Sequence, residues 1–298
     1  MVGARTVRQG TGPYLTAALH QQGALISGVV GTSTETAAEA VATLEKEAGI
    51  TASGYADLES ALTLEEPDFV VICSPWRVHE SQLQLVADHH CHCLAEKPLL
   101  WPADENTATD LIRRFESAGL LLQMVGQWPL ALPHFETLHG ALPDTIETFE
   151  MRLSPISLGP HMVPDAAPHF LSLLHALAGA GRCEDIRFHP GDVGQLAINC
   201  GFEHDAGTIE AALVLETVAQ RPRPAWFTIN GLRAERVVQM PDYNQFLVSD
   251  GASVALPDPM GEVAADFLGN YRAGAKTDGA LLNSLHRNLC RLAGAWPD

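Results

Sequence analysis

Residues 69–98 read FVVICSPWRVHESQLQLVADHHCHCLAEKP, and this stretch decides the fold class. Two short apolar runs, 69–73 and 91–95, flank a helical pattern at 80–88, which is the strand–helix–strand order typical of a parallel sheet. The second run ends directly in Glu96-Lys97-Pro98. The pattern therefore predicts a buried strand that carries a lysine at its tip.

Lys97 is the first candidate for chemistry. Its neighbours Glu96 and Pro98 restrict it, so it is not a typical solvated surface charge. Lysine side chains change their pKa readily when the ammonium is partly desolvated, which makes a restrained lysine a candidate proton donor and acceptor. This feature favours an enzyme.

The same alternation of strands and helices extends through the first 130 residues. Strands are expected at 24–30, 69–73, 91–95 and 120–125, and helices at 14–22, 34–48, 58–62, 80–88 and 106–118. Beyond Pro129, period-two patterns predict antiparallel strands at 146–153, 195–200, 208–216, 225–229, 235–240 and 245–248, with helices at 166–177, 261–271 and 279–293. We therefore expect an α/β protein. A Rossmann-type, doubly wound parallel sheet (1–128) should bind a dinucleotide, and an α+β domain (129–298) with a largely antiparallel, open-faced sheet should bind the substrate.

Composition narrows the function classes. The chain of 298 residues has 36 acidic and 18 basic residues, a net charge of −18. Such a field repels phosphate backbones and anionic membranes, so we expect neither a nucleic-acid nor a membrane partner. No apolar run reaches the roughly 20 residues that span a bilayer, and residues 1–12 lack the apolar core of a secretion signal. The six cysteines show no disulfide spacing, which favours a cytoplasmic protein with reduced thiols.

The run His89-His90-Cys91-His92-Cys93 invites a metal interpretation. Its ligand-type residues are nearly consecutive, however, and alternate side chains of a strand point to opposite faces. We favour a turn that enters a buried strand, and we predict no metal site.

Gly10-Thr11-Gly12-Pro13 is the candidate dinucleotide turn. Glycines let a phosphate approach the backbone, the helix that follows supplies amide donors, and proline is favoured in a first helical turn. Leu15 stands where the third glycine of the usual fingerprint would fall, so we expect looser helix–strand packing there. The preceding strand is short: either Gly3 ends it, or it starts upstream of the sequence shown.

The end of the second strand bears on the choice of nicotinamide cofactor. An acid there would bind the ribose diol and repel a 2′-phosphate, but the chain reads Val30-Gly31-Thr32-Ser33. Hydroxyl residues at a helix start can contact a phosphate, so Thr32 and Ser33 favour NADP over NAD. Arg5 and Arg8 are further candidates for phosphate contact, although solvated loop arginines are more common.

Taken together, these motifs resemble the Gfo/Idh/MocA family of oxidoreductases, which includes glucose–fructose oxidoreductase and inositol dehydrogenase. The resemblance spans nearly the whole chain. Its most specific part runs from the strand at 69–73 through a Ser-Pro turn, a histidine four residues after that proline, and the Glu-Lys-Pro motif. The resemblance implies that Lys97 contacts the reacting hydroxyl or carbonyl, and that these residues lie around the nicotinamide and its ribose: Ser74, Pro75, His79, Glu96 and Lys97.

A second part of the resemblance lies in Asp165-Ala166-Ala167-Pro168-His169. Positions i and i+4 share one helix face, so the carboxylate and the imidazole can point into one cleft. A helix cap at Asp165 with a partly buried histidine is the structural alternative, and Pro168 is expected only within a first turn. The family pattern has both residues facing the nicotinamide. Where the family often has a further aspartate, this chain has Ser172.

Gln127 and Trp128 follow the last Rossmann strand, where the family places residues near the substrate. We select Gln127 for a polar contact with the bound ligands. For Trp128 we favour burial at a domain boundary.

The resemblance implies an NAD(P)-dependent dehydrogenase that transfers a hydride between nicotinamide and a secondary alcohol or ketone of a sugar- or polyol-like molecule. Lys97 would exchange the hydroxyl proton, His169 would relay it, and Asp165 would orient the imidazole or the substrate. The family also implies a homodimer or homotetramer formed through the second domain's sheet. Two alternatives stay open: a non-catalytic dinucleotide-binding regulator, and a redox-neutral lyase or glycosidase that uses the cofactor transiently.

Overall fold

The structure is a computed structural model, and it describes residues 1–5 and 10–296. The chain forms two compact units, each described by itself. The first unit comprises Met1–Val125 and Pro259–Gly279, and the second comprises Gly126–Asp258 and Ala280–Asp298. The expected α/β class, with a parallel sheet followed by a mostly antiparallel one, is confirmed. The functional division at residue 128 stays a prediction.

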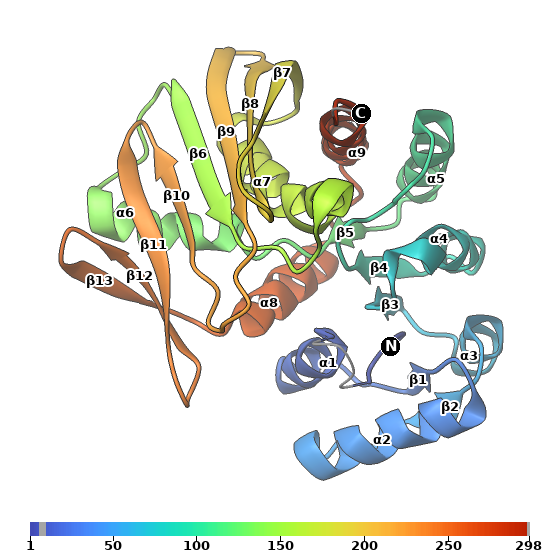
Figure 1. The fold of residues 1–298 in the computed structure, drawn as a ribbon. Coiled ribbons are helices and arrows are strands. Elements are labelled where there is room, and N and C mark those ends of the chain that lie inside the picture. The colour runs from blue at the N-terminus through green and yellow to red at the C-terminus, as the bar shows by residue number, and fades with distance from the viewer. Residues whose placement is uncertain (6–9, 297–298) are drawn as a thin grey trace. The chain divides into compact units, whose positions relative to one another are not determined.

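The first unit contains a parallel sheet of the doubly wound type (Figure 1). Val2 connects its two halves, because it forms parallel bridges to Val30 on one side and to Ile72 on the other. The strand order is therefore β2, β1, the segment around Val2, β3, β4 and β5. The bounds are β1 (Gly28–Val30), β2 (Ser53–Tyr55), β3 (Phe69–Ile72), β4 (His92–Ala95) and β5 (Leu122–Met124).

The segment around Val2 is short but well bonded. Its backbone N–H donates to Val71 O and its carbonyl accepts from Cys73 N, both at 2.8 Å, while Val30 N donates to Met1 O at 2.8 Å. Hydrogen bonds on both sides make this segment the central strand of the sheet. Gly3 therefore lies at the end of that strand.

Six α-helices accompany this sheet in the described part of the first unit. The predicted helix at 34–48 coincides with α2, whose start is held by a capping box between Ser33 and Thr36. Asp57 and Asp104 cap α3 and α5 through their carboxylates. The bounds are α1 (Gly12–Gln21), α2 (Thr34–Ala48), α3 (Leu58–Glu65), α4 (His79–Asp88), α5 (Glu105–Ser117) and α8 (Pro259–Arg272).

The second unit contains an eight-stranded sheet in the order β13-β12-β11-β10-β6-β9-β8-β7. Among its described strands, β6 and β9 pair in parallel and the other neighbours are antiparallel. The bounds are β6 (Thr148–Leu153), β7 (Gly181–Pro190), β8 (Gln195–His204), β9 (Gly207–Glu216), β10 (Ala225–Ile229), β11 (Leu232–Gln239), β12 (Asn244–Ser249) and β13 (Ala252–Leu256).

The described residues of this second unit form the α-helices α6 (Leu132–His139), α7 (Met162–Ala178) and α9 (Gly279–Gly294). Helix α7 packs against β6 and β9 (Figure 1). Phe170 of α7 stacks on Phe149 of β6 with ring centroids 5.4 Å apart. The expectation that Pro168 lies in a first turn is wrong, because α7 already begins at Met162 and holds Pro168 in its interior. A 3-10 turn at Gly159–His161 leads directly into the helix, which therefore begins earlier in the chain than the predicted residue 166.

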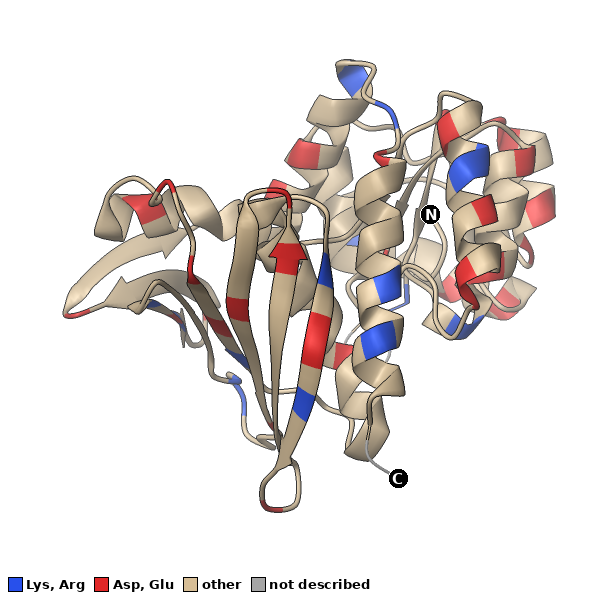
Figure 2. Ribbon diagram, turned by 90° about the horizontal axis from the view of Figure 1, so that it is seen from above, with Lys and Arg blue, Asp and Glu red and all other residues tan. Residues whose placement is uncertain are grey.

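None of the described helices is long and apolar enough to cross a membrane. Acidic residues predominate along the ribbon in Figure 2, in keeping with the net charge of −18.

Candidate functional site

Three chain segments meet at the carboxyl ends of the central strands of the first unit: those around Gly3, Gly12 and Ser74. Gly3 ends the strand around Val2, and a Cβ built on it would lie 2.7 Å from Cys73 C and 2.8 Å from Ser74 N. No side chain fits there, and Gly3 has a φ of +82°, which favours glycine. Between these strands the order of the sheet reverses, and doubly wound sheets bind nucleotides at that reversal.

Gly12 controls how closely α1 approaches this point. A Cβ on Gly12 would lie 2.1 Å from the carbonyl oxygen of Gly3. The expectation of loose packing, drawn from Leu15, is therefore wrong for this helix: the close approach occurs one turn earlier, at Gly12. Pro13 lies in the first turn of α1, as predicted.

Thr11 connects the dinucleotide turn to the Glu-Lys-Pro segment. Its hydroxyl donates to one carboxylate oxygen of Glu96, and the other oxygen accepts from the backbone N–H of Lys97 at 3.1 Å. Thr11 is the N-cap residue of α1, yet its side chain makes no capping hydrogen bond. The first amides of α1 therefore lack a side-chain cap, which suits an anionic group at this helix end.

Ser74 and His79 organise the neighbouring turn. The Ser74 hydroxyl donates to Gln82 Oε1 at 2.5 Å. His79 is fully buried; its Nε2 lies 2.9 Å from Ser74 O, and its Nδ1 lies 3.1 Å from Pro98 O. The imidazole thus ties the Ser-Pro turn to the Glu-Lys-Pro turn. Direct contact of Ser74, Pro75 or His79 with a cofactor stays a prediction.

Lys97 itself follows β4 and is half-buried. The thiol of Cys73 lies near Thr11 and Glu96, and burial raises its pKa, so it is a neutral group in this cluster. Neither Thr11 nor Cys73 was among the residues predicted from the sequence. Thr11 lies between Gly10 and Gly12, and Cys73 directly follows β3; these positions were the sequence signals that could have indicated them.

The turn after β1 is organised around Thr36. Its hydroxyl accepts from the backbone N–H groups of Thr32 and Ser33, each at 2.9 Å. These two amides are therefore satisfied within the protein. Arg5 forms an ion pair with Glu39 of α2, with Nη2 2.8 Å from Oε2. Arg8 lies outside the described residues.

The remaining selected residues lie in the second unit. Asp165 and His169 are four positions apart on α7, so they share a helix face. Asp165 Oδ2 accepts from the backbone N–H of Ile156 at 3.0 Å and of Ser157 at 3.2 Å. The carboxylate thereby anchors the loop before α7. Ser172 donates to His169 O at 2.9 Å, a contact within the helix.

Gln127 is half-buried in the loop after β5. Its neighbour Trp128 is buried; the ring packs edge-on against Phe227, and the Arg236 guanidinium lies 5.4 Å from its centroid. The expected burial of Trp128 is confirmed, whereas its position at a domain boundary stays a prediction. Phe227 and Arg236 both belong to the second unit.

The histidine–cysteine run has dispersed contacts. His89 Nε2 lies 3.2 Å from Glu59, whereas His92 Nδ1 accepts from the backbone of Leu121 at 2.8 Å. Cys93 is fully buried. In the part of the chain that the structure describes, no three His, Cys, Asp or Glu side chains gather as metal ligands.

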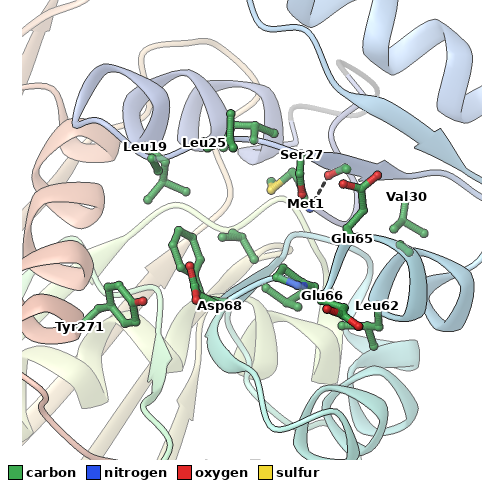
Figure 3. A pocket seen from close by; sticks show the side chains of 18 of the residues that line it. Met1, Leu19, Leu25, Ser27, Val30, Leu62, Glu65, Glu66, Asp68 and Tyr271 are labelled. Carbon is green, nitrogen blue, oxygen red and sulfur yellow. Dashed lines mark hydrogen bonds between the residues drawn. The ribbon is translucent and has the colours of Figure 1, made fainter.

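A cavity of about 370 Å³ lies at the opposite, amino-terminal edge of the parallel sheet (Figure 3). Ser27 and Asp68 line it directly before β1 and β3, and Tyr271 of α8 forms part of its wall. Because nucleotides bind at the carboxyl ends of such strands, this cavity is separate from the predicted dinucleotide site.

Comparison with known proteins gives matches in sequence and in fold. Residues 1–126 match the profile of the Gfo/Idh/MocA group, described as the oxidoreductase family with an NAD-binding Rossmann fold. Comparison with curated protein sequences found no match.

Several solved structures share the fold of both units. UDP-N-acetylglucosamine 3-dehydrogenase GnnA from Acidithiobacillus ferrooxidans is 21% identical with a TM-score of 0.71, over 99% of this chain and 95% of that one. KijD10, a 3-ketoreductase from Actinomadura kijaniata in complex with TDP-benzene and NADP, is 16% identical with a TM-score of 0.68, over 99% and 96%. An oxidoreductase from Agrobacterium radiobacter in complex with NAD+, L-tartaric acid and magnesium is 14% identical with a TM-score of 0.67, over 96% and 95%. At these identities the likeness concerns the fold.

Proposed function

Since residues 1–126 match the profile of the Gfo/Idh/MocA oxidoreductase family, we propose that the protein transfers a hydride between a nicotinamide dinucleotide and a secondary alcohol or its ketone. One observation carries this proposal. Lys97 follows β4 in the Rossmann unit, and its backbone is hydrogen-bonded to Glu96, which accepts from Thr11 of the dinucleotide turn. The turn that carries the proposed proton-transferring side chain is thus joined to the proposed cofactor-binding loop.

The substrate in this proposal is a small, sugar- or polyol-like molecule. Support comes from two proteins of the same fold, named as a UDP-N-acetylglucosamine 3-dehydrogenase and a 3-ketoreductase. Both names describe chemistry at a carbinol or carbonyl carbon. Assembly into a homodimer or homotetramer through the second sheet, and a place in the cytoplasm, also stay proposals.

The chain's residues suit a dinucleotide at the sheet reversal. Gly3 and Gly12 leave no room for a side chain, and the uncapped start of α1 offers amide donors to a pyrophosphate. The proposed cofactor contacts are Gly10, Gly12, Pro13, Thr32, Ser33, Ser74, Pro75, His79, Glu96, Lys97 and Gln127. When bound, the nicotinamide supplies the hydride donor or acceptor.

NADP is the proposed preference over NAD. No acid follows β1 at Gly31, Thr32 or Ser33 to hold a ribose diol. Arg5 reaches α2, where its guanidinium pairs with Glu39, so a cation lies beside the helix that follows β1. The amides of Thr32 and Ser33 are already bonded to Thr36, so the proposed contacts with a 2′-phosphate come from the side-chain hydroxyls of Thr32 and Ser33.

The proposed proton path uses Lys97 and His169. In the direction of oxidation, the neutral amine of Lys97 accepts the hydroxyl proton, and in reduction the ammonium returns it. The charged ammonium also stabilises a developing alkoxide. His169 hydrogen-bonds the same oxygen and relays the proton. Asp165, anchored to the amides of Ile156 and Ser157, holds the first part of α7 and thereby the helix that bears His169.

The Lys97→Ala variant tests this mechanism. Loss of the amine removes general acid–base catalysis, so we expect turnover to fall by about 10²–10⁴-fold while NADPH affinity changes little. Turnover is followed as NADPH absorbance with a panel of polyols and keto-sugars, and cofactor affinity by fluorescence titration with NADPH and NADH.

Lys46→Ala is the matched control, because Lys46 is an exposed lysine near the end of α2. Unchanged turnover in the Lys97 variant would remove this residue from the mechanism. Tight dinucleotide binding without turnover on any substrate would favour the non-catalytic regulator, and product without net cofactor reduction would favour the redox-neutral enzyme. Tighter binding of NADH than of NADPH contradicts the cofactor preference.

A further inference from the structure

A cleft of about 320 Å³ opens on the first unit and is lined by Trp76, Arg77, Glu80, Trp101 and Pro102. Trp76 and Trp101 are both half-buried, so part of each large aromatic surface stays in contact with solvent. Most aromatic rings of this size lie in a core or at a binding surface, because exposing them to water is unfavourable. Two tryptophans that line one cleft mark it as a candidate binding surface.

The walls of this cleft belong to the two turns that hold the proposed active site. Trp76 comes two residues after Ser74, and Trp101 comes four residues after Lys97. Buried His79 joins these turns, because Nε2 lies 2.9 Å from Ser74 O while Nδ1 lies 3.1 Å and 3.2 Å from Pro98 O and Leu99 O. The cleft therefore has walls held at a fixed separation, a feature of preformed ligand sites.

The polar groups of the cleft narrow the chemistry of its ligand. The Arg77 guanidinium stacks over Trp76, 5.0 Å from the ring centroid, which restricts both side chains. Arg77 supplies hydrogen-bond donors and Glu80 supplies acceptors, so the lining carries one charge of each sign. A locally neutral lining, on a chain with net charge −18, suits an uncharged ligand better than an anion.

A pyranose ring combines an apolar C–H face with hydroxyl groups around its edge. We propose that this cleft binds the neutral pyranose ring of the substrate, with its C–H face on Trp101 or Trp76 and its hydroxyls on Arg77 and Glu80. This assignment rests on the proposed function in naming the ring as part of the substrate. The cleft would hold the part of the substrate that does not react, and position it relative to Lys97.

The test is a titration of the cofactor-free protein with neutral methyl hexopyranosides of the gluco, galacto and manno series, followed by tryptophan fluorescence. We expect at least one glycoside to give a saturable change. The Trp101→Leu variant should weaken that binding by about tenfold, the effect of one lost aromatic stacking contact. Trp101→Phe, which keeps an aromatic face, should retain most of the affinity.

Trp226→Phe is the matched control. Trp226 is also half-buried and also carries a stacked arginine, with Arg233 4.2 Å from its ring centroid, but it lies on β10 of the second unit. Its replacement should leave glycoside affinity unchanged. Thermal unfolding of each variant verifies folding. Glu80→Gln provides a second test, because it leaves the aromatic walls intact. This variant should bind the glycoside more weakly through loss of a charged acceptor.

Three outcomes would overturn the proposal. These are the absence of binding by any glycoside, unchanged binding in Trp101→Leu, and a Trp101-dependent response to adenosine monophosphate in place of the glycosides. The titration requires neither cofactor nor turnover, so it can succeed even if hydride transfer is not the activity. If turnover is found, the Trp101→Leu variant should raise KM far more than it lowers kcat.

Discussion

At the scale of a residue, Gly12 controls how closely the candidate dinucleotide turn approaches the sheet. The missing side chain lets α1 begin in contact with the backbone of Gly3, and it places the first amides of the helix next to the sheet reversal. Thr11, directly before it, leaves the helix end uncapped and hydrogen-bonds Glu96 instead. The dinucleotide turn and the lysine-bearing turn are thus coupled by a single side chain.

We predict that Gly12→Ala destabilises the protein. The added Cβ would lie 2.1 Å from Gly3 O, a backbone atom that can move only with the central strand. Overpacking of this kind costs about 1–3 kcal/mol in the free energy of unfolding. Urea unfolding measures the loss, and dinucleotide affinity should fall with it.

Gly269→Ala is the control for this substitution. Gly269 lies within α8, and a Cβ there would meet nothing within 4 Å. Alanine should therefore stabilise the protein by about 0.5–1 kcal/mol through its higher helix propensity. If both alanine variants changed stability in the same direction, the steric account of Gly12 would be wrong.

At the scale of elements, helices α7 and α9 are joined to β7 by a buried polar network. His175 of α7 donates from Nδ1 to Leu171 O at 2.7 Å, and its Nε2 lies 2.8 Å from Ser284 Oγ of α9. Asn288 of α9 donates to Gly181 O at 2.9 Å and accepts from Cys183 N at 2.8 Å. These contacts fix the edge strand β7 to two helices.

This network makes stability depend on pH. Burial lowers the pKa of His175 from 6.5 to about 4, so the folded protein holds a neutral imidazole where the unfolded chain takes up a proton. The contribution is fully present above pH 6.5 and is lost as the pH falls from 6.5 to about 4. The loss should approach about 3 kcal/mol in the free energy of unfolding.

Urea unfolding at pH 7.5, 6, 5 and 4.5 measures this effect by comparing the parent protein with His175→Gln. The variant should be less stable near neutrality, and its stability should decline less steeply as the pH falls. His161→Gln, an exposed histidine just before α7, is the control and should keep the parent slope. Equal slopes for the parent and His175→Gln would contradict the prediction.

At the scale of the whole molecule, the chain contributes to the first unit twice. Helix α8, more than 130 residues beyond β5, packs on α1 and places Phe267 and Tyr271 against Phe69, with ring centroids 5.3 Å and 5.6 Å apart. Thr277, shortly after it, bonds the backbone of Leu122 at 2.8 Å. The Rossmann unit is therefore completed by residues 259–279, which come after residues 126–258 of the second unit in the sequence.

We predict that residues 1–125 alone do not fold cooperatively. Without α8, Phe69 and its neighbours lose their cover, and the exposed apolar surface should promote aggregation. Joining residues 259–279 to this fragment through a flexible linker should restore a cooperative thermal transition. A sharp transition in the 1–125 fragment, at the same temperature as in the extended fragment, would show that α8 is dispensable.

The sequence by itself was sufficient for the alternation of strands and helices, because buried strands and amphipathic helices leave periodic patterns. The helix at 34–48 and the strand at 225–229 were predicted to the residue. Short or polar elements left no such pattern: β2 forms because it pairs with β1, and β7 carries charged residues and a bulge between Glu184 and Arg187. Such elements depend on partners distant in the chain.

The same division applies to the candidate site. Lys97, Glu96 and the glycines were selected from local motifs, since the chemistry expected of them requires particular neighbours in sequence; their roles stay predictions. Only the tertiary structure decided that Thr11 hydrogen-bonds Glu96, that His79 joins two turns, and that Trp76 and Trp101 line one cleft. The physical reason is that local sequence sets the conformation of each turn, whereas the packing of the sheet sets which turns become neighbours.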